Sequence, residues 1–578
     1  MTTMVAPPEA GLAPAPPTET TSTRGPSRFV WLVVAALVVG LALRIAIGLT
    51  DDSPATDEAA YLGSGISLIE GDGYQRDGRP ELHFPPFVPF VLGLASRAFA
   101  DPHVGTVVVT CLASTAVIVP LALLGRRIGG PAAGAATAWV AALGPALSTT
   151  LVNRGAGSEA IYTLLVVVAV WLVVAAADRQ GRARTWRVVG AGTLVGCAYL
   201  SRPEGLILAL PLGLAVLAIA ARAAHGHGGW WRTFGPRTLR LPVAFAVPIV
   251  ACIVPYSLYL HEHTGEWRLS GKGQGVALER WQSLAGGDRE ARDSVVYALD
   301  ETGLEFAATE RNHVLSAVSE DPRNYIGIVR TNAGKLVDSV VGQVGKEQVL
   351  SWLLLPLPLW LLAIAGAWQH RRSGTVRLLL AVGALPVATA LAFFVQFRYM
   401  IVAVALATPL IGAGAALVTA RWRRPVLAAM VALLLLSSVQ GFYSTGSGWW
   451  HPPENTDERR AGEWLAANIG PDDRVITRSM VVEHYADRPT MAMPYADLDD
   501  IVRYARHHGA QYLVLDRNTA RLRPQLAPLR RKDDVPGLRP VHEVQVEGRT
   551  AAIFALEPAP PKDRPMGAPL GFKIDELD

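Results

Sequence analysis

The chain has 578 residues, of which 51% are hydrophobic and only 18% are charged, and its mean hydropathy is +0.28. A soluble protein carries about a quarter charged residues, so this composition excludes an ordinary soluble enzyme, a disordered protein and a disulfide scaffold. The net charge is only +4, and the three cysteines lie inside apolar blocks, where we expect neither disulfides nor thiolate chemistry.

The first 28 residues are rich in Pro, Thr and Ala and show no apolar periodicity. We expect residues 1–28 to form a disordered cytoplasmic tail. The first apolar block, 29–49, follows this tail, and no small-residue cleavage site follows the block. The block is therefore predicted to be a membrane span and not a signal peptide.

Apolar blocks recur along the chain at lengths that suit membrane helices, since about 20 apolar residues cross a bilayer. Eleven are predicted to span: 29–49, 104–124, 131–150, 159–177, 188–201, 205–222, 242–260, 351–369, 378–397, 399–420 and 425–443. Arg44 is the only charge well inside a block, and an isolated charge is costly at that depth. The sequence thus predicts an α-helical polytopic membrane domain over 29–443.

The basic residues of the connecting segments orient these spans, because Lys and Arg gather on the cytoplasmic side of a membrane. With a cytoplasmic N-terminus, the inner segments hold eighteen arginines and the short outer segments hold six. Eleven spans then place the C-terminal segment outside. We therefore expect a multi-pass protein of the cell membrane, with its N-terminus cytoplasmic and its C-terminal domain extracytoplasmic.

Two long loops face outside in this topology. The first, 50–103, holds nine carboxylates against three bases. Its stretches 59–70 and 87–99 are amphipathic or apolar, and we expect two helices along the membrane surface there. The second loop, 261–350, shows helical spacing of its apolar residues over 292–318 and 322–341.

The chain beyond residue 452 has the composition of a water-soluble domain, predicted over 452–556 and followed by a loose tail, 557–578. Its predicted elements are a helix over 456–468, a strand over 474–477, a helix from Asp497 to His508 and a strand over 511–515. This alternation of helices and strands is typical of a small α/β domain.

Asp57 and Glu58, just beyond the first span, are the first candidate site residues. A carboxylate pair at the membrane face can act as a general base on a hydroxyl group there. Pro85 and Pro86 favour this interpretation, since they fix the path of the same loop. The alternative, which the sequence leaves open, is that both carboxylates are solvated loop charges.

Arg202 is the second candidate. The block before it, 188–201, is roughly 21 Å of helix, shorter than the hydrocarbon core of about 30 Å. Arg202 is therefore expected below the outer surface, where a guanidinium needs an anionic partner. Glu204 and a lipid phosphate are the two alternatives that the sequence offers.

Further candidates lie at outer span ends and in one loop. Arg154 and Glu159 end one hairpin, and Arg398 and Tyr399 end another, where Arg with Tyr is commonly an interfacial anchor. The Gly-rich segment around Lys272 is typical of an exposed loop, although backbone N–H groups in such a loop can wrap a phosphate. The histidines are not spaced for zinc, and a divalent ion on the outer-loop aspartates stays open.

The motifs and their order resemble the GT-C superfamily of integral membrane glycosyltransferases. Within it they are similar to glycosyltransferase family 39, which includes the protein O-mannosyltransferases and the bacterial aminoarabinose transferases that modify lipid A. The matching stretches are Asp57–Tyr61, His83–Phe87, Gly157–Ala160, Ser201–Gly205 and Phe397–Tyr399. The resemblance covers about 29–443.

This resemblance implies a glycosyltransferase that moves a sugar from a polyprenyl-phosphate donor to a hydroxyl acceptor outside the cell, with inversion. It implies Asp57 as the general base, with Glu58 assisting or orienting it. The implied donor-phosphate residues are Arg202, Arg398, Arg154 and Lys272, and the implied substrate-binding residues are His83, Glu159, Glu204 and Tyr399. No cofactor is required, and a divalent cation is left open. The implied partners are the lipid-linked donor, the bilayer and a glycan, lipid or protein acceptor, and no nucleic acid.

Two other functions remain open at this stage. A transporter or flippase for a lipid-linked sugar would share the spans and the arginines. A non-catalytic envelope protein would bind glycan through 452–556 and would not need Asp57. In the soluble domain, Glu483, His484, Tyr485 and Arg488-Pro489 are candidates for a surface facing the active cavity.

Overall fold

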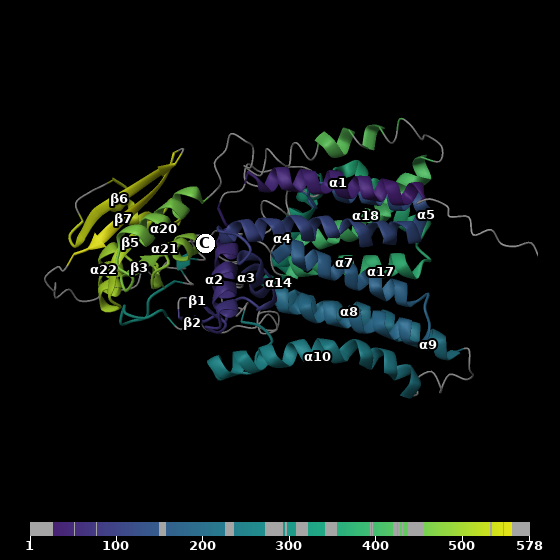
Figure 1. Ribbon diagram of the computed structural model, residues 1–578, viewed down its shortest axis with the longest axis horizontal. Helices are drawn as coiled ribbons and strands as arrows, with labels where there is room; N and C mark the ends of the chain where they lie inside the picture. The colour runs from purple at the N-terminus through teal and green to yellow at the C-terminus, as the bar shows by residue number, and fades with distance from the viewer. Residues whose placement is uncertain are drawn as a thin grey trace, which may run out of the picture.

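The computed structural model describes residues 27–557, with gaps at 51–52, 77, 149–157, 226–235, 272–292, 295–296, 308–321, 342–354, 393–394, 396, 420–424, 426–427, 431, 437–454, 532–534 and 547. Long helices run side by side along the longest axis, and a smaller domain of helices and strands lies at one end of them (Figure 1). The fold is therefore the predicted helical bundle with an α/β domain.

The first three spans form a compact corner of the bundle. Helix α1 (Arg28–Gly48) packs on α4 (Pro102–Ala116) and α5 (Ile118–Leu143). The chain reverses inside α5 at Gly129 and Gly130, where Gly130 has φ +80°, a value that glycine adopts readily. A Cβ on Gly125 would collide with the hydroxyl of Thr137. The two arms of α5 therefore lie against each other, as the separate blocks 104–124 and 131–150 predict.

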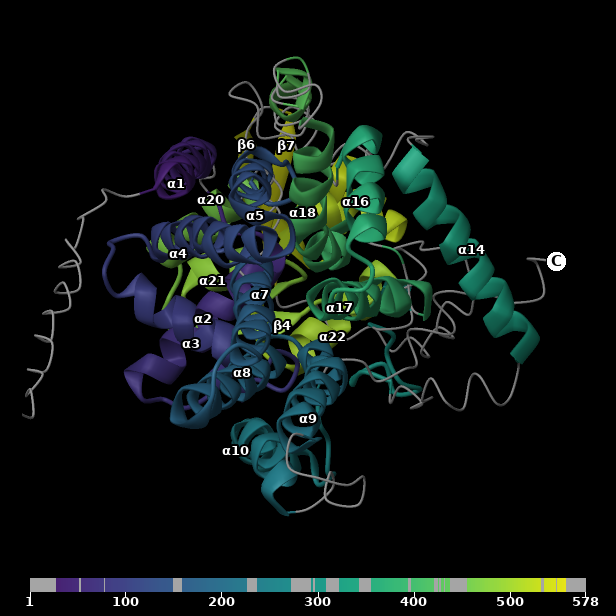
Figure 2. The same ribbon diagram turned by 90° about the vertical axis from the view of Figure 1, so that its right-hand side faces the viewer.

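The remaining long helices complete the bundle. They are α7 (Ser158–Ala176), α8 (Gly181–Ser201), α9 (Ala209–His225), α10 (Pro236–Thr264), α14 (Pro322–Val341), α16 (Leu357–Gln369), α17 (Gly374–Ala392) and α18 (Phe397–Thr419), with a 3-10 turn η1 (Pro203–Leu208) between α8 and α9. Helix α7 contacts α4, α5, α8 and α18 and lies near the middle of the bundle in the end-on view (Figure 2).

Seven stretches in the described part of the chain are long and apolar enough to cross a membrane, with Pro102–Leu143 counted as one although it holds the reversal. Helix α8 is not among them, and α16 is shorter because it begins only after its N-cap residue, Pro356. The first four residues of its predicted block 351–369 lie outside the described residues. The block 425–443 is described at positions 425, 428–430 and 432–436. The protein is thus a multi-pass membrane protein, and the count of eleven stays a prediction.

The first outer loop contains the two predicted surface helices, α2 (Thr56–Glu70) and α3 (Phe87–Ser96). Both run across the direction of the long helices at the end of the bundle (Figure 1). They touch backbone to backbone, because a Cβ on Gly65 would collide with the carbonyl oxygen of Pro89. A short ladder of β1 (Gln75–Arg76) and β2 (Arg79–Pro80) lies between them in the sequence.

The soluble domain is a five-stranded sheet in the order β4-β3-β5-β7-β6. Its strands are β3 (Arg474–Thr477), β4 (Thr490–Ala492), β5 (Ala510–Leu515), β6 (Leu538–Val546) and β7 (Arg549–Leu556), and its helices are α20 (Thr456–Asn468), α21 (Met480–Ala486), α22 (Leu498–His507), α23 (Arg517–Leu522) and α24 (Ala527–Arg531), with η3 (Pro524–Leu526). Strand β3 is parallel to β4 and β5, while β7 is antiparallel to β5 and β6. The predicted small α/β domain is present.

The second outer loop differs from its predicted pattern in one place. Residues 297–307, part of the stretch 292–318 with helical spacing, form turns closed by an antiparallel bridge between Leu299 and Phe306. Both side chains pack into the core of the soluble domain, and the ring of Phe306 lies 5.6 Å from that of Tyr504. The apolar residues of this stretch thus contact the soluble domain and do not form one face of a helix.

The soluble domain is fastened to the end of the bundle that carries α2. Arg76 of β1 pairs with Glu483 of α21 at 2.9 Å, and Asp101, just before α4, pairs with Arg459 of α20 at 3.0 Å. The buried side chain of Asn455 donates to the carbonyl oxygen of Pro54 at 2.9 Å. These contacts attach the domain to three places in the first outer loop: before α2, at β1 and before α4.

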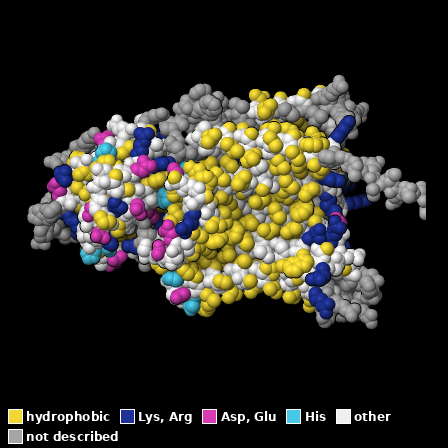
Figure 3. All heavy atoms as spheres, viewed as in Figure 1, with side chains coloured by type: hydrophobic (Ala, Val, Ile, Leu, Met, Phe, Trp, Pro, Cys, Tyr) yellow, Lys and Arg dark blue, Asp and Glu magenta, His cyan; other side chains and the backbone are white. Residues whose placement is uncertain are grey.

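The surface is divided along the long axis. Figure 3 shows a broad apolar belt over the bundle, Lys and Arg side chains gathered at the end of the bundle far from the soluble domain, and acidic side chains at the near end. Arg126 and Arg127 lie in α5 just before its reversal at Gly129 and Gly130, and Arg182 and Arg184 lie in the first turn of α8. Such a distribution is typical of a membrane protein with one strongly basic face.

Candidate active site

Asp57 lies in the first turn of α2, at the end of the bundle. Glu58 accepts from the backbone N–H of Ala55 at 3.4 Å, which caps the helix. Carboxylates in a first turn also interact favourably with the positive end of the helix dipole. The start of α2 is therefore well defined, and it places the carboxylate of Asp57, about one third exposed, toward α18.

Arg398, in the first turn of α18, is the partner of Asp57. Its Nη1 lies 3.0 Å from Oδ2 of Asp57 and 3.9 Å from Oε1 of Glu159 on α7. The guanidinium also lies over the ring of Tyr399, 5.4 Å from its centroid. Arg398 is thus more than an interfacial anchor, because it joins the first outer loop to α7.

Arg202 is buried at the C-terminal cap of α8, where Pro203 ends the helix and begins η1. Its Nη1 lies 2.6 Å from Oε1 of Glu159, and its Nη2 lies 3.4 Å from Oε1 of Glu204. Ser158 donates to the second oxygen of Glu159 at 3.0 Å. The buried guanidinium expected from the short helix therefore has two protein carboxylates as partners, of which only Glu204 is foreseen by the sequence.

These side chains surround one pocket between α7, α17, α18 and η1. Its lining residues are Glu159, Tyr162, Thr163, Arg202, Glu204, Ile207, Leu208, Leu385, Pro386, Thr389, Arg398, Tyr399 and Val402. Arg202 lies over the rings of Tyr399 and Tyr162, at 5.1 Å and 5.8 Å from their centroids. The pocket therefore has an apolar wall on α17 and a charged wall with two arginines.

Glu58 occupies a different place from its neighbour. Its Oε1 lies 2.8 Å from Nδ1 of His103 on α4, and both side chains are buried. The resemblance implies that Glu58 assists or orients Asp57. The contact with His103 favours the orienting role, since it fixes the first turn of α2 against α4.

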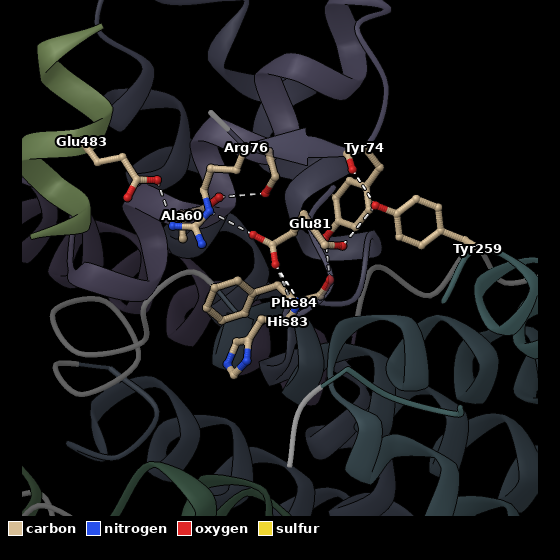
Figure 4. Close-up of polar contacts among 9 residues, drawn as sticks. Ala60, Tyr74, Arg76, Glu81, His83, Phe84, Tyr259 and Glu483 are labelled. Atoms are coloured by element: carbon tan, nitrogen blue, oxygen red, sulfur yellow. Dashed lines mark hydrogen bonds and ion pairs between the residues drawn. The ribbon is translucent and has the colours of Figure 1, made fainter. Parts of the chain in front are cut away.

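His83 is also separate from the charged wall of the pocket. Glu81 accepts from the backbone N–H groups of His83 and Phe84 at 2.7 Å and 3.1 Å, while Arg76 holds the other oxygen of Glu81. Figure 4 shows this network, with the imidazole of His83 pointing away from it. Tyr259 of α10 donates to the carbonyl oxygen of Tyr74 at 2.7 Å and ties the loop to the bundle.

Two candidates, Arg154 and Lys272, lie outside the described residues. The segment just before Lys272 is described, and its position is informative. A Cβ on Gly271 would collide with the carbonyl oxygen of Leu82, and Tyr199 donates to the carbonyl oxygen of Leu269 at 2.6 Å. The Gly-rich segment thus begins beside His83.

A metal site is absent from the part of the chain that the structure describes, where no three His, Cys, Asp or Glu side chains are grouped to hold an ion.

In the soluble domain, Glu483 contacts the bundle through its ion pair with Arg76. His484 and Tyr485 lie near Asp101, and burial lowers the pKa of His484 to about 4, so it is neutral. Arg488 contacts carbonyl oxygens of its own domain, at Ala466 and Ile469, and not the bundle.

Some pocket residues escape sequence reasoning. Tyr162 follows Glu159 by three positions on α7, so the shared helix face is a usable signal. Leu385, Pro386 and Thr389 of α17 stand in an ordinary apolar span, and no pattern marks them.

Comparison with known proteins gives one family match. Residues 83–255 match the model of the dolichyl-phosphate-mannose-protein mannosyltransferase family. No curated protein sequence matches the chain.

Among solved structures, the chain is similar to the archaeal oligosaccharyltransferase AglB from Archaeoglobus fulgidus, in complex with an inhibitory peptide and a dolichol-phosphate. The identity is 14%, the match covers 91% of this chain and 74% of that chain, and the TM-score is 0.52. A structure of the Archaeoglobus fulgidus oligosaccharyltransferase with Zn and sulfate gives 14% identity, coverage of 84% and 68%, and a TM-score of 0.51.

ArnT from Cupriavidus metallidurans, bound to undecaprenyl phosphate, is 14% identical over 92% of this chain and 98% of that chain, with a TM-score of 0.45. The family-model match and the oligosaccharyltransferase structures confirm the resemblance drawn from the sequence motifs: the chain has a GT-C-like membrane fold, and its residues 83–255 match the dolichyl-phosphate-mannose-protein mannosyltransferase family.

Proposed function

We propose that the protein is a membrane glycosyltransferase that moves a sugar from a polyprenyl-phosphate donor to a hydroxyl acceptor on the extracytoplasmic side. The observation that carries this proposal is the contact of Asp57 with Arg398 at the edge of a pocket that also holds Arg202. Two cations that line the pocket, Arg202 and Arg398, thus lie close to a base that contacts one of them, and these are the groups that transfer from a lipid phosphate needs.

In this mechanism Asp57 accepts the proton of the acceptor hydroxyl while the oxygen of that hydroxyl attacks the anomeric carbon of the sugar. The bond from that carbon to the phosphate oxygen breaks, and its electron pair leaves with the lipid phosphate. Arg398 and Arg202 stabilise the negative charge that develops on the leaving group. Attack from the side opposite the phosphate inverts the anomeric centre. Tyr399 holds both guanidinium groups in place.

The distribution of basic side chains on the surface supports a reaction on the extracytoplasmic side. Basic side chains lie at the end of the bundle far from the soluble domain, as Figure 3 shows, and the positive end of a membrane protein faces the cytoplasm. The pocket with Asp57 is near the other end, beside the soluble domain. The N-terminus and the basic loops are thus proposed to be cytoplasmic and the soluble domain extracytoplasmic.

The test is transfer from polyprenyl-phosphate sugars in membranes, comparing the wild type with Asp57→Asn. This change keeps the size of the side chain and removes the base, so we expect activity to fall by about 100-fold or more at equal expression. Glu70→Gln, at the exposed end of the same helix, is the matched control and should keep full activity. Equal transfer by wild type and Asp57→Asn would exclude Asp57 as the base.

A further inference from the structure

The arginines of the pocket are already occupied by protein carboxylates. Arg202 and Arg398 face three of them, Asp57, Glu159 and Glu204. An anion that enters this set of charges competes with a carboxylate for a guanidinium. The next step is to identify which ion pair in the described part of the pocket an incoming anion would disrupt.

Burial distinguishes the ion pairs. The side chains of Arg202 and Glu159 are 9% and 3% exposed, and Ser158 adds a hydrogen bond to Glu159. Separating a buried ion pair is strongly unfavourable. In the pair of Asp57 and Arg398 the side chains are 33% and 28% exposed, so this pair is far less buried than that of Arg202 and Glu159.

Glu204 is the other exposed carboxylate, but its partner differs. Its side chain is 36% exposed and lies 3.4 Å from Arg202, which is itself buried and which keeps the closer contact to Glu159. Removing Glu204 would therefore leave Arg202 still paired with Glu159. Glu159 lies 2.6 Å from Arg202 but 3.9 Å from Arg398, so it would be a weaker partner for Arg398 if Asp57 left. Arg398 is thus the guanidinium most available for exchange with an incoming phosphate.

We infer that Asp57 and the donor phosphate compete for the guanidinium of Arg398, so that donor binding releases the base that the reaction uses. This inference rests on the proposed function. A carboxylate held by a guanidinium is a weaker proton acceptor than a free one. Without donor, Asp57 is held by Arg398. With donor, the phosphate takes the N–H groups of Arg398, and Asp57 is free to accept the hydroxyl proton.

The test measures binding of undecaprenyl monophosphate to the full-length protein in detergent, without any transfer reaction. Asp57→Asn removes the competing charge, so this variant should bind the lipid phosphate about fivefold more tightly than the wild type, although it loses catalysis. An unchanged or weaker affinity of Asp57→Asn would overturn the inference.

Two further variants locate the competition. Arg398→Gln should bind the lipid phosphate more weakly, and adding Asp57→Asn to it should bring no further gain, since the guanidinium for which they compete is gone. Glu204→Gln should have a smaller effect than Asp57→Asn. A gain with Glu204→Gln and none with Asp57→Asn would place the exchange at Arg202 and contradict the inference. Glu70→Gln is the control for a charge change on α2.

This design separates the two proposals. Loss of transfer in Asp57→Asn with unchanged affinity for undecaprenyl monophosphate would retain the transferase and reject the competition. Tighter binding by Asp57→Asn, in a protein that transfers no polyprenyl-phosphate sugar, would retain the competition and reject the transferase.

Discussion

Arg44 shows how a single charge is accommodated inside the bundle. Its side chain is fully buried in α1, and it donates to the carbonyl oxygens of Ala141 and Ala142 at 3.0 Å and 3.1 Å and to Ser114 at 3.1 Å. The last carbonyl groups of a helix lack partners within the helix. Arg44 supplies those partners at the end of α5, so this charge needs no carboxylate.

Arg44→Met should therefore destabilise the protein, because it leaves buried carbonyl groups without donors while keeping most of the side-chain volume. We expect a loss of at least about 2 kcal/mol, visible as a lower midpoint of thermal unfolding in detergent. Arg182→Met, on an exposed position of α8, is the control and should keep the midpoint. Equal midpoints for both variants would show that Arg44 is not needed for stability.

At the scale of elements, β3 and β5 end side by side and gather buried carboxylates at their carboxyl ends. Glu458 at the start of α20 contacts Ser479, which follows β3, and accepts from Asn518 of α23 at 3.0 Å. Burial, and then the charge of Asp516 after β5, raises the pKa of Glu458 to about 8. The folded domain therefore keeps a proton on Glu458 at neutral pH.

This proton makes the stability of the domain depend on pH. Between the ordinary pKa of a glutamate and about 8, the folded state binds more protons than the unfolded state, so stability falls as pH rises through this window. Protection of the β3 and β5 amides from hydrogen exchange, corrected for intrinsic rates, should be lower at pH 8 than at pH 5.

Glu458→Gln retains both hydrogen-bonding positions and removes the titration, so its corrected protection should be the same at both pH values. Glu463→Gln, an exposed position on α20, should behave like the wild type. A pH dependence that persists in Glu458→Gln would mean that another group is responsible.

At the scale of the whole molecule, the second outer loop is fixed to the soluble domain by one ion-pair cluster. Asp293 is buried, and its Oδ1 accepts from Arg478 at 2.9 Å, while its Oδ2 lies 3.7 Å from Arg523. The backbone N–H of Tyr495 donates to the carbonyl oxygen of Tyr297 at 2.8 Å. The loop therefore continues the surface of the domain.

Asp293→Asn should loosen this attachment, since a hydrogen bond between charged groups contributes about 1.5–3 kcal/mol, and both Arg478 and the buried Arg523 lose their counter-ion. We expect hydrogen exchange over 297–307 to rise about tenfold or more, while exchange in α7 stays the same. Glu301→Gln, exposed in the same segment, should cause no such rise. Unchanged exchange in Asp293→Asn would show that apolar packing alone holds the loop.

The sequence predicts this molecule well wherever the signals are local. The helix over 456–468 and the strand over 474–477 agree with α20 and β3, because caps, turns and apolar periodicity act over a few residues. Pairings across the chain leave no such signal. Glu58 with His103 and Glu159 with Arg202 are 45 and 43 residues apart, and only the fold brings them together.

The pairing of Asp57 with Arg398 has a consequence for the synthesis of the protein. These residues are 341 positions apart, and Arg76 and Glu483, which fasten the soluble domain beside them, are 407 apart. A nascent chain thus carries the aspartate into the membrane long before the ribosome reaches the arginine. The ion pair can form only after Arg398 has been synthesised, so translation that stops before this residue yields a chain in which Asp57 lacks this guanidinium.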